Sequence, residues 1–143
     1  MKKVLVLLGP NLNMIGYRET DIYGKETSAN IEKQIRSKAA LKGLLCEIFQ
    51  SNWEGALIDK IHEANNNFDA IILNAGALTH YSLALRDAIA SVDVPCIEVH
   101  MSNIYAREKY RKKSVIAEVC VGQIVGFGKS VYFLALDAII GLI

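Results

Sequence analysis

The chain has 143 residues, the usual size of one domain, and a formal net charge of +1 at pH 7. It is 52% hydrophobic and 22% charged, which excludes a disordered chain and gives no sign of a polyelectrolyte partner. The one basic cluster, residues 107–113, is too short for the broad basic stripe that nucleic-acid binding favours, so we predict a solvated surface there.

The three cysteines, Cys46, Cys96 and Cys120, are isolated in the sequence, and each lies in or beside an apolar run. Free cysteine in this setting is typical of a small buried side chain, and no Cys-x-x-Cys or His-x-His pair offers the spacing of a metal site. We therefore expect no metal and a reducing compartment, the cytoplasm. The apolar run Val4–Leu8 is too short for a signal peptide or a membrane span.

The first half of the chain alternates between apolar runs and helical repeats. Val4–Leu8 predicts a strand buried on both faces, and it ends at Gly9-Pro10. A polar stretch over 11–25 follows, which is longer than most connections and is typical of a functional loop. A helix is predicted over about 29–41, with Gly43 as its stop, and Leu45–Gln50 predicts the second strand.

The second half continues this alternation. Asn52 is expected to cap a helix, and Ala70–Leu73 predicts a third buried strand. The apolar positions of the helices before and after this strand repeat at helical spacing: Leu57, Ile58, Ile61 and Ala64, then Leu85, Ala88, Ile89 and Val92. Two further strands, Cys96–Val99 and Val115–Val121, and a C-terminal helix, Val131–Ile143, complete the prediction. The pattern predicts an α/β fold, with a flavodoxin-like, doubly wound, five-stranded parallel sheet in a single domain over 1–143.

Polar residues follow three of these strands at the point where each strand ends. They occupy positions 9–13, 74–80 and 100–103. Because ligands of parallel sheets bind outside the carboxyl ends of the strands, we expect the three segments to form one site. Their amides, hydroxyls and backbone N–H groups suit a small polyol with one negative charge, whose carboxylate would lie near Met101 and Ser102. His62 falls on a predicted helix and is interpreted as structural.

Nucleotide binding is the main alternative for a sheet of this kind. Gly128-Lys129-Ser130 resembles the end of a phosphate loop, but that motif needs a glycine where Gln123 stands. No Gly-x-Gly-x-x-Gly follows the first strand, where Pro10 and Asn11 occupy the place of the glycines. The sequence therefore disfavours both a dinucleotide enzyme and a flavodoxin-like electron carrier.

Eight segments carry a recognisable pattern: GPNLN at 9–13, GYRETDIYG at 16–24, QSN at 50–52, LNAGALTH at 73–80, ALRD at 84–87, IEVHMSNI at 97–104, ARE at 106–108 and GQIVGFG at 122–128. Together they resemble type II 3-dehydroquinate dehydratases over essentially the whole chain. The resemblance implies dehydration of 3-dehydroquinate to 3-dehydroshikimate by anti elimination through an enolate, with no cofactor, metal or Schiff base. It also implies the shikimate route to aromatic amino acids or quinate breakdown, and a homododecamer built of four trimers.

The resemblance assigns the catalytic roles residue by residue. Tyr23 matches the base that removes a proton next to a ketone. A tyrosine with its ordinary pKa of about 10 is protonated at neutrality, so this role needs cationic neighbours, for which Arg107 and Arg18 are candidates. Arg18 also matches the arginine of a mobile lid, roughly 16–25. His100 matches the proton donor to the departing hydroxyl, and Glu98, on the same strand face, is expected to orient its ring.

The remaining candidates contact the substrate or the enolate. Asn11 is expected to position a water on the enolate oxygen. The residues that match the family's substrate pocket are Asn74, Gly76, His80, Met101, Ser102 and Arg111. Asp87 also matches a ligand-site position, where it either pairs with Arg86 or reaches the site of a neighbouring subunit. The departures from the family pattern, at Trp53, Tyr105, Lys112 and Lys113, fall on none of these residues.

A binding protein or sensor that kept this pocket and lost catalysis is a further alternative. Such a protein has no need for Tyr23, Arg18 and His100 together, so the sequence favours an enzyme. An electron carrier would reveal itself by a yellow flavin colour.

Overall fold

Five strands form one sheet in which every neighbouring pair is parallel. The computed structural model describes residues 1–143. The strands are β1 (Lys3–Leu8), β2 (Leu45–Gln50), β3 (Ala70–Asn74), β4 (Cys96–His100) and β5 (Gly122–Val125), and they follow the order β2-β1-β3-β4-β5 across the sheet. This is the flavodoxin-like order, with its switch point between β1 and β3. The predicted fold class is confirmed.

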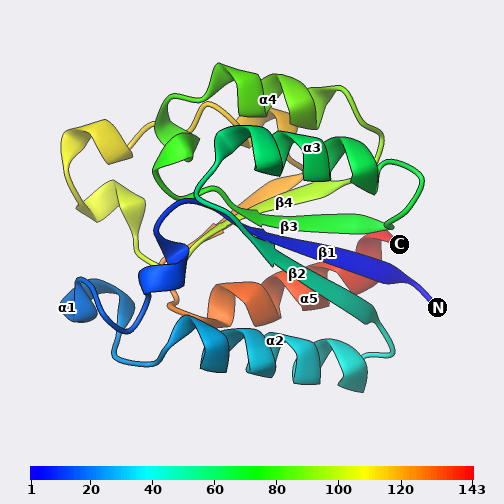
Figure 1. The fold of residues 1–143 in the computed structure, drawn as a ribbon, viewed down its shortest axis with the longest axis horizontal. Coiled ribbons are helices and arrows are strands. Elements are labelled where there is room, and N and C mark those ends of the chain that lie inside the picture. The colour runs from blue at the N-terminus through cyan, green and yellow to red at the C-terminus, as the bar shows by residue number, and fades with distance from the viewer.

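Helices cover both faces of the sheet (Figure 1). α2 (Ser28–Leu41) and α5 (Ser130–Leu142) pack on one face, and α3 (Glu54–Ala64) and α4 (Leu83–Ala90) pack on the other. Alternate residues of β1 enter the two cores, with Val4 and Val6 under α2 and α5 and with Leu5 and Leu7 under α3 and α4. Burial on both faces explains why β1 reads as a continuous apolar run.

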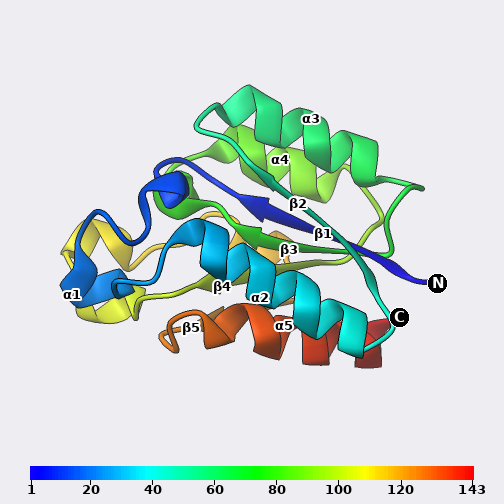
Figure 2. The ribbon, with the colours of Figure 1, turned by 60° about the horizontal axis from the view of Figure 1, so that its bottom comes forward.

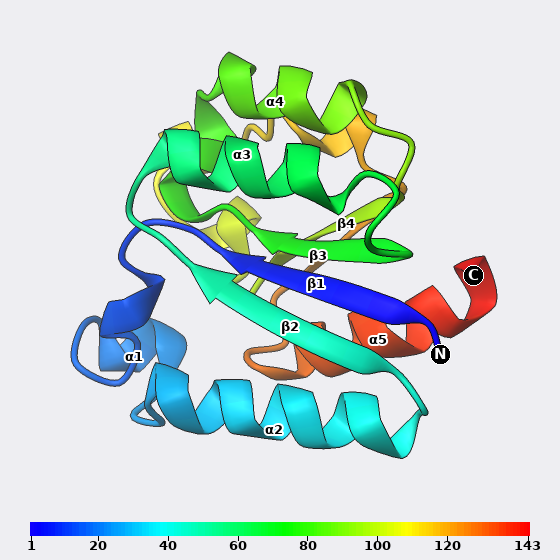
Figure 3. The same cartoon turned by 45° about the vertical axis from the view of Figure 1, so that its right-hand side comes forward.

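The carboxyl ends of the strands lie at one end of the molecule, and both chain termini lie at the other (Figures 2 and 3). The connection between β1 and α2 lies at the first end and contains the short helix α1 (Thr20–Tyr23). Short 3-10 helices over Leu12–Met14, Gly76–His80, Ile104–Ala106 and Lys109–Arg111 shape the segments after β1, β3 and β4. None of the helices is both long and apolar enough to cross a membrane.

The predicted fifth strand over Val115–Val121 is wrong. The Ser114 hydroxyl accepts hydrogen bonds from the backbone N–H groups of Ile116 at 3.3 Å and Ala117 at 3.1 Å, which turn the chain into a 3-10 helix over Ala117–Val119. Val115 and Ile116 fill the core under α4 instead of joining the sheet. The fifth strand forms later, at Gly122–Val125, where a glycine and a glutamine weaken the strand pattern in the sequence.

Two helix ends also differ from their predictions. The residue that caps α3 is Trp53, whose side chain makes no capping hydrogen bond. Asn52 instead contacts the turn after β1, where its Oδ1 accepts a hydrogen bond from the backbone N–H of Asn11 at 2.9 Å. α4 ends at Ala90, so Val92 lies beyond the helix.

The cysteines and His62 lie away from the carboxyl ends of the central strands. All three cysteines are free; Cys96 is buried as predicted, whereas Cys46 and Cys120 are half-buried. His62 is exposed on the surface of α3.

Candidate active site

A cleft opens at the carboxyl ends of β1, β3 and β4, and segments far apart in the sequence meet on its walls. All of the candidate residues except Glu98 and Asp87 line it: Asn11, Arg18, Tyr23, Asn74, Gly76, His80, His100, Met101, Ser102, Arg107 and Arg111. The structure therefore brings together the polar segments that follow the three strands, and it adds the lid segment to them.

Strand β4 places Glu98 and His100 on the same face of the sheet. Oε2 of Glu98 lies 2.6 Å from Nε2 of His100, and both side chains are buried. Burial acts to raise the pKa of Glu98, but hydrogen bonds from His100, Gln123 and Ser114 outweigh it and lower that pKa. Because an ionised carboxylate only accepts hydrogen bonds, Nε2 of His100 donates to Glu98, and Nδ1 is the nitrogen left for a ligand.

His80 lies beside His100, with ring centroids 6.5 Å apart and ring planes at 19°. Its Nδ1 lies 2.8 Å from the backbone carbonyl oxygen of Lys113 and donates to it, because a carbonyl only accepts. Burial lowers the pKa of His80, which favours the neutral ring. Nε2 of the neutral ring is a hydrogen-bond acceptor, as a ligand hydroxyl requires.

Two guanidinium groups surround the ring of Tyr23. Nη1 of Arg107 donates a hydrogen bond to the Tyr23 hydroxyl oxygen at 2.7 Å. The guanidinium carbons of Arg18 and Arg107 lie 5.0 Å and 5.4 Å from the ring centroid. The Arg107 side chain is only 9% exposed, so solvent screens its charge weakly. Two positively charged groups therefore lie against this tyrosine, one of them hydrogen-bonded to its hydroxyl oxygen.

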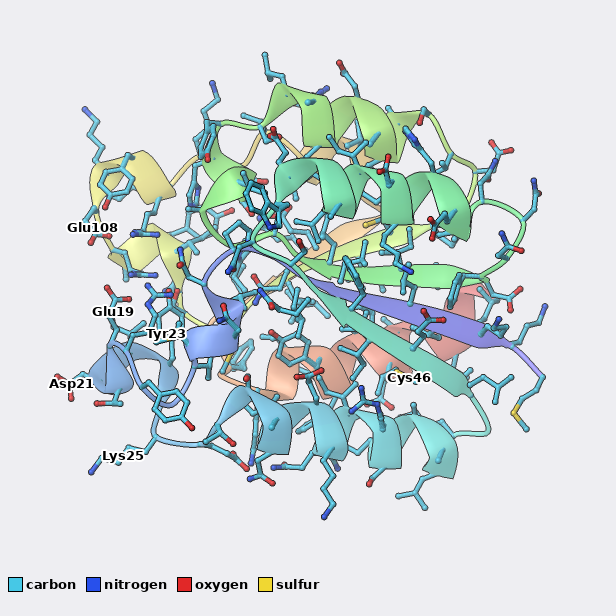
Figure 4. The ribbon with its side chains drawn as sticks, viewed as in Figure 1. Glu19, Asp21, Tyr23, Lys25, Cys46 and Glu108 are labelled. Carbon is cyan, nitrogen blue, oxygen red and sulfur yellow. The ribbon has the colours of Figure 1, made fainter.

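The Glu19 carboxylate contacts both arginines. Its Oε2 accepts hydrogen bonds from Nη2 of Arg18 at 2.7 Å and from Nη2 of Arg107 at 3.4 Å. Its backbone adopts the left-handed conformation, with φ at 42°, which is uncommon for a residue other than glycine. Figure 4 shows Glu19 and Tyr23 between the blue lid and the yellow segment that carries Glu108. Sequence reasoning missed Glu19, because one carboxylate in a polar loop forms no pattern.

Asn74, at the end of β3, is held by α5. Its Nδ2 donates a hydrogen bond to the hydroxyl oxygen of Tyr132 at 2.9 Å, and its Oδ1 accepts one from the backbone N–H of Gly76 at 3.2 Å. Tyr132 is buried, and burial raises its pKa to about 12, so its hydroxyl stays protonated. Tyr132 was missed from the sequence, where it is one apolar position in the C-terminal helix.

The turns after β1 and β3 approach each other closely. A Cβ on Gly9 would lie 2.5 Å from the carbonyl oxygen of Ala75, and one on Gly76 would lie 3.0 Å from the carbonyl oxygen of Pro10. Gly76 also has a φ of 60°, which favours glycine. The two glycines therefore allow the turn that carries Asn11 to pack against the turn after β3.

The segment after β4 supplies a further part of the cleft wall. Ser102 is buried, and its Oγ accepts a hydrogen bond from Nη1 of Arg107 at 3.3 Å. Met101 is buried beside it. Nε of Arg111 donates to Glu108 at 2.7 Å, and Arg111 is the third guanidinium at the cleft, after Arg18 and Arg107.

Asp87 lies outside the cleft of its own chain. It is exposed on α4, and its carboxylate makes no hydrogen bond or ion pair there. Its sequence neighbour Arg86 donates to the carbonyl oxygen of Val115 at 2.8 Å and pairs with Glu118 at 3.3 Å, so of the two alternatives for Asp87 the ion pair with Arg86 is wrong.

Known proteins resemble this chain over nearly its whole length. The family model described as dehydroquinase class II matches residues 2–140. A 3-dehydroquinate dehydratase of Bacillus cereus (strain AH187) is 58% identical over 97% of this chain and 95% of its own length. A 3-dehydroquinate dehydratase of Bacillus anthracis (strain A0248) matches to the same extent, with 58% identity over 97% of this chain and 95% of its own.

Solved structures agree with this match. The type II dehydroquinase of Butyrivibrio crossotus DSM 2876 superposes with a TM-score of 0.95 and 49% identity, covering 96% of this chain and 97% of that one. The type II dehydroquinase of Propionibacterium acnes superposes with a TM-score of 0.94 and 38% identity, covering 96% and 95%. The resemblance read from the sequence is thereby confirmed, and the chain belongs to the class II dehydroquinase family.

Proposed function

We propose that this chain is a hydro-lyase that converts 3-dehydroquinate to 3-dehydroshikimate. The observation that carries the proposal is the Tyr23 hydroxyl, which accepts a hydrogen bond from Arg107 in the same cleft as the His100–Glu98 pair. A dehydration of this kind needs a base for a carbon acid and an acid for the departing hydroxyl, and these groups supply one of each.

In the first step, the Tyr23 oxygen takes the proton next to the substrate ketone. The electron pair of the broken C–H bond forms the enolate, whose oxygen bonds to a water positioned by Asn11. Arg18 and Arg107 stabilise the phenolate before this step and the negative charge that moves into the substrate during it.

In the second step, the enolate collapses and expels the β-hydroxyl on the opposite face. The hydroxyl leaves as water, with a proton from Nδ1 of His100. Ionised Glu98 supports this role, because it accepts the hydrogen bond from Nε2 and leaves Nδ1 of the ring for the departing hydroxyl. The two steps remove one water in all and use no cofactor or metal.

The remaining residues of the cleft hold the substrate. The buried Ser102 hydroxyl and the backbone at Met101 take the carboxylate, and Asn74, His80 and Arg111 take the ring hydroxyls. Gly76 keeps that wall close to the turn after β1. Residues 16–25 act as a lid that brings Arg18 and Tyr23 onto the bound substrate.

The assembly is a homododecamer built of trimers, in which Asp87 reaches the cleft of a neighbouring subunit. Its exposed, unpaired carboxylate outside its own cleft supports this placement. Light scattering of the purified protein measures the assembly. An Asp87→Asn chain mixed with a Tyr23→Phe chain should regain activity if the two residues serve each other's sites. The proposed setting is the cytoplasm, in aromatic amino-acid synthesis or quinate breakdown.

The direct test is turnover of 3-dehydroquinate by chelator-treated protein, followed by the ultraviolet absorbance of the conjugated enone product. A parallel sample contains borohydride, which traps a Schiff base if a lysine is the nucleophile. Turnover that survives both treatments is the expected result. Substrate binding without turnover would overturn the proposal in favour of a protein that binds the acid without transforming it.

A further inference from the structure

A chain of polar side chains lies behind His100, on the side away from the cleft. The Tyr105 hydroxyl donates to Oε1 of Gln123 at 2.8 Å, and Nε2 of Gln123 donates to Oε2 of Glu98 at 3.0 Å. The same Oε2 lies 2.6 Å from Nε2 of His100. β4 and β5 set this contact, because Glu98 and Gln123 are partners in the parallel register of the two strands.

The Ser114 hydroxyl completes the surroundings of the carboxylate. Its Oγ lies 3.0 Å and 2.9 Å from the two oxygens of Glu98. Since this oxygen also accepts from the backbone N–H groups of Ile116 and Ala117, its own hydrogen is left for Glu98. The 0% exposed carboxylate is therefore surrounded by donors from three separate segments.

The Glu98 carboxylate determines which end of the Gln123 amide faces it, and the Tyr105 hydroxyl holds the other end. The oxygen and nitrogen ends of a glutamine amide have nearly the same shape, so the hydrogen-bond partners decide its orientation. A carboxylate only accepts, so Glu98 takes the NH₂ end; the Tyr105 hydroxyl then donates to Oε1 and holds the amide in place. Tyr105 is itself placed by the Asn103 side chain, which accepts from its backbone N–H at 3.2 Å.

We propose that Gln123 and Tyr105 are positioning residues for His100, acting in series through the Glu98 carboxylate. Tyr105 holds the Gln123 amide in place, the amide holds Glu98, and Glu98 holds the ring of His100 with Nδ1 toward the substrate. The inference rests on the proposed role of His100 as the proton donor. Other titratable or charged groups near the pair are His80 and Arg111 on the cleft side and Cys96 on β4.

If Tyr105 and Gln123 act in series on Glu98, their substitutions should change kcat in a particular pattern. Tyr105→Phe and Gln123→Leu should each lower kcat by about 5- to 20-fold and change KM by less than about twofold, because a charge-assisted hydrogen bond behind the acid is lost while the pocket is kept. The double variant should be no slower than Gln123→Leu alone, because the hydroxyl acts only through the amide. Tyr81→Phe is the matched control, since it removes an exposed tyrosine hydroxyl outside the chain of contacts.

A spectroscopic readout separates positioning from a general loss of structure. The protein has three histidines, so the ring ¹⁵N signals can be assigned with His62→Gln and His80→Asn variants. The His100 ring signals should shift in Tyr105→Phe and Gln123→Leu, and the His62 signals should stay in place. If Gln123→Leu fails to fold, Tyr105→Phe carries the test alone, because its side chain is 46% exposed.

The outcomes distinguish this inference from the proposed function. Full turnover by His100→Asn would overturn the role of His100 and the inference with it. Loss of turnover in His100→Asn, with Tyr105→Phe and Gln123→Leu equal to Tyr81→Phe, would overturn the inference alone. Additive losses in the double variant would also overturn it, because they would mean that the two side chains act independently.

Discussion

The hydroxyl oxygen of Tyr23 accepts a hydrogen bond from Arg107 at 2.7 Å, although 84 positions separate the two residues. The lid therefore meets the segment after β4 at this oxygen. The proposed base role of Tyr23 therefore depends on a contact that joins two distant segments of the chain.

Tyr23→Phe should lower kcat by about 10²- to 10⁴-fold, the usual contribution of a positioned base, and leave the affinity for 3-dehydroshikimate within about threefold. Only the hydroxyl is removed, so the packing of the ring against both arginines is kept. Steady-state kinetics and calorimetry measure the two effects. Tyr17→Phe, at an exposed lid tyrosine, is the control. Equal losses of binding and turnover would argue against the base role.

Glu19→Gln should slow turnover by about two- to fivefold, because a partly exposed pair contributes at most about 1 kcal/mol. The Glu19 side chain is 40% exposed and contacts both Arg18 and Arg107. Asp21→Asn removes an exposed carboxylate from α1 that pairs with no group, so it tests for a general effect of lid charge. A loss in Asp21→Asn that equals the loss in Glu19→Gln would refute a specific clamp.

Tyr132→Phe should raise KM more than it lowers kcat, and it should cost about 1–3 kcal/mol of the free energy of unfolding. Without the hydroxyl, Nδ2 of the buried Asn74 loses its acceptor. Urea denaturation and steady-state kinetics measure the two effects. Tyr110→Phe, at a 63% exposed tyrosine, should leave the unfolding free energy unchanged.

The free energy of unfolding should depend on pH through Glu98. Its pKa is lowered in the folded chain, so its contribution to stability is present above the unfolded pKa of about 4.5 and is lost as the pH falls through the folded value. Glu98→Gln should flatten the decline in thermal stability below about pH 4.5. Melting curves of both proteins from neutral to acid pH measure this, and equal slopes in acid would contradict it.

Gly9→Ala should destabilise the protein by about 1–3 kcal/mol, the usual cost of an overpacked site, and should reduce activity. The new Cβ would meet the carbonyl oxygen of Ala75 at 2.5 Å and push apart the turns that carry Asn11 and Gly76. Gly55→Ala is the control, because nothing lies within 4 Å of its added Cβ on α3. Urea denaturation of both variants makes the comparison, and equal stability would show that the turns can separate freely.

The sequence predicted the layers of the fold and most of the cleft wall, because both follow from local patterns. Continuous apolar runs mark strands buried on both faces, and polar residues at their carboxyl ends mark the site. The prediction of the fifth strand at Val115–Val121 was wrong for a local reason that hydropathy does not show. The Ser114 hydroxyl bonds the next backbone N–H groups and turns an apolar run away from the sheet.

The residues that the sequence did not reveal act across long separations. Tyr132 contacts Asn74 from α5, 58 positions away, and Glu19 contacts Arg107 from 88 positions away. Each looks ordinary in its own segment, one as an apolar helix position and the other as a loop carboxylate. Such contacts depend on how the elements pack, so no local sequence pattern predicts them.

The ring of His80 is fixed by the main chain at Lys113, and no side chain is involved. Any amino acid presents the same carbonyl there, so residue 113 is free to vary while the ring keeps the same tautomer. If His80 binds a ring hydroxyl as proposed, its preference for a hydrogen-bond donor depends on the course of the backbone at Lys113. Side chains at 112 and 113 can therefore change without altering the hydrogen bond that holds the His80 ring.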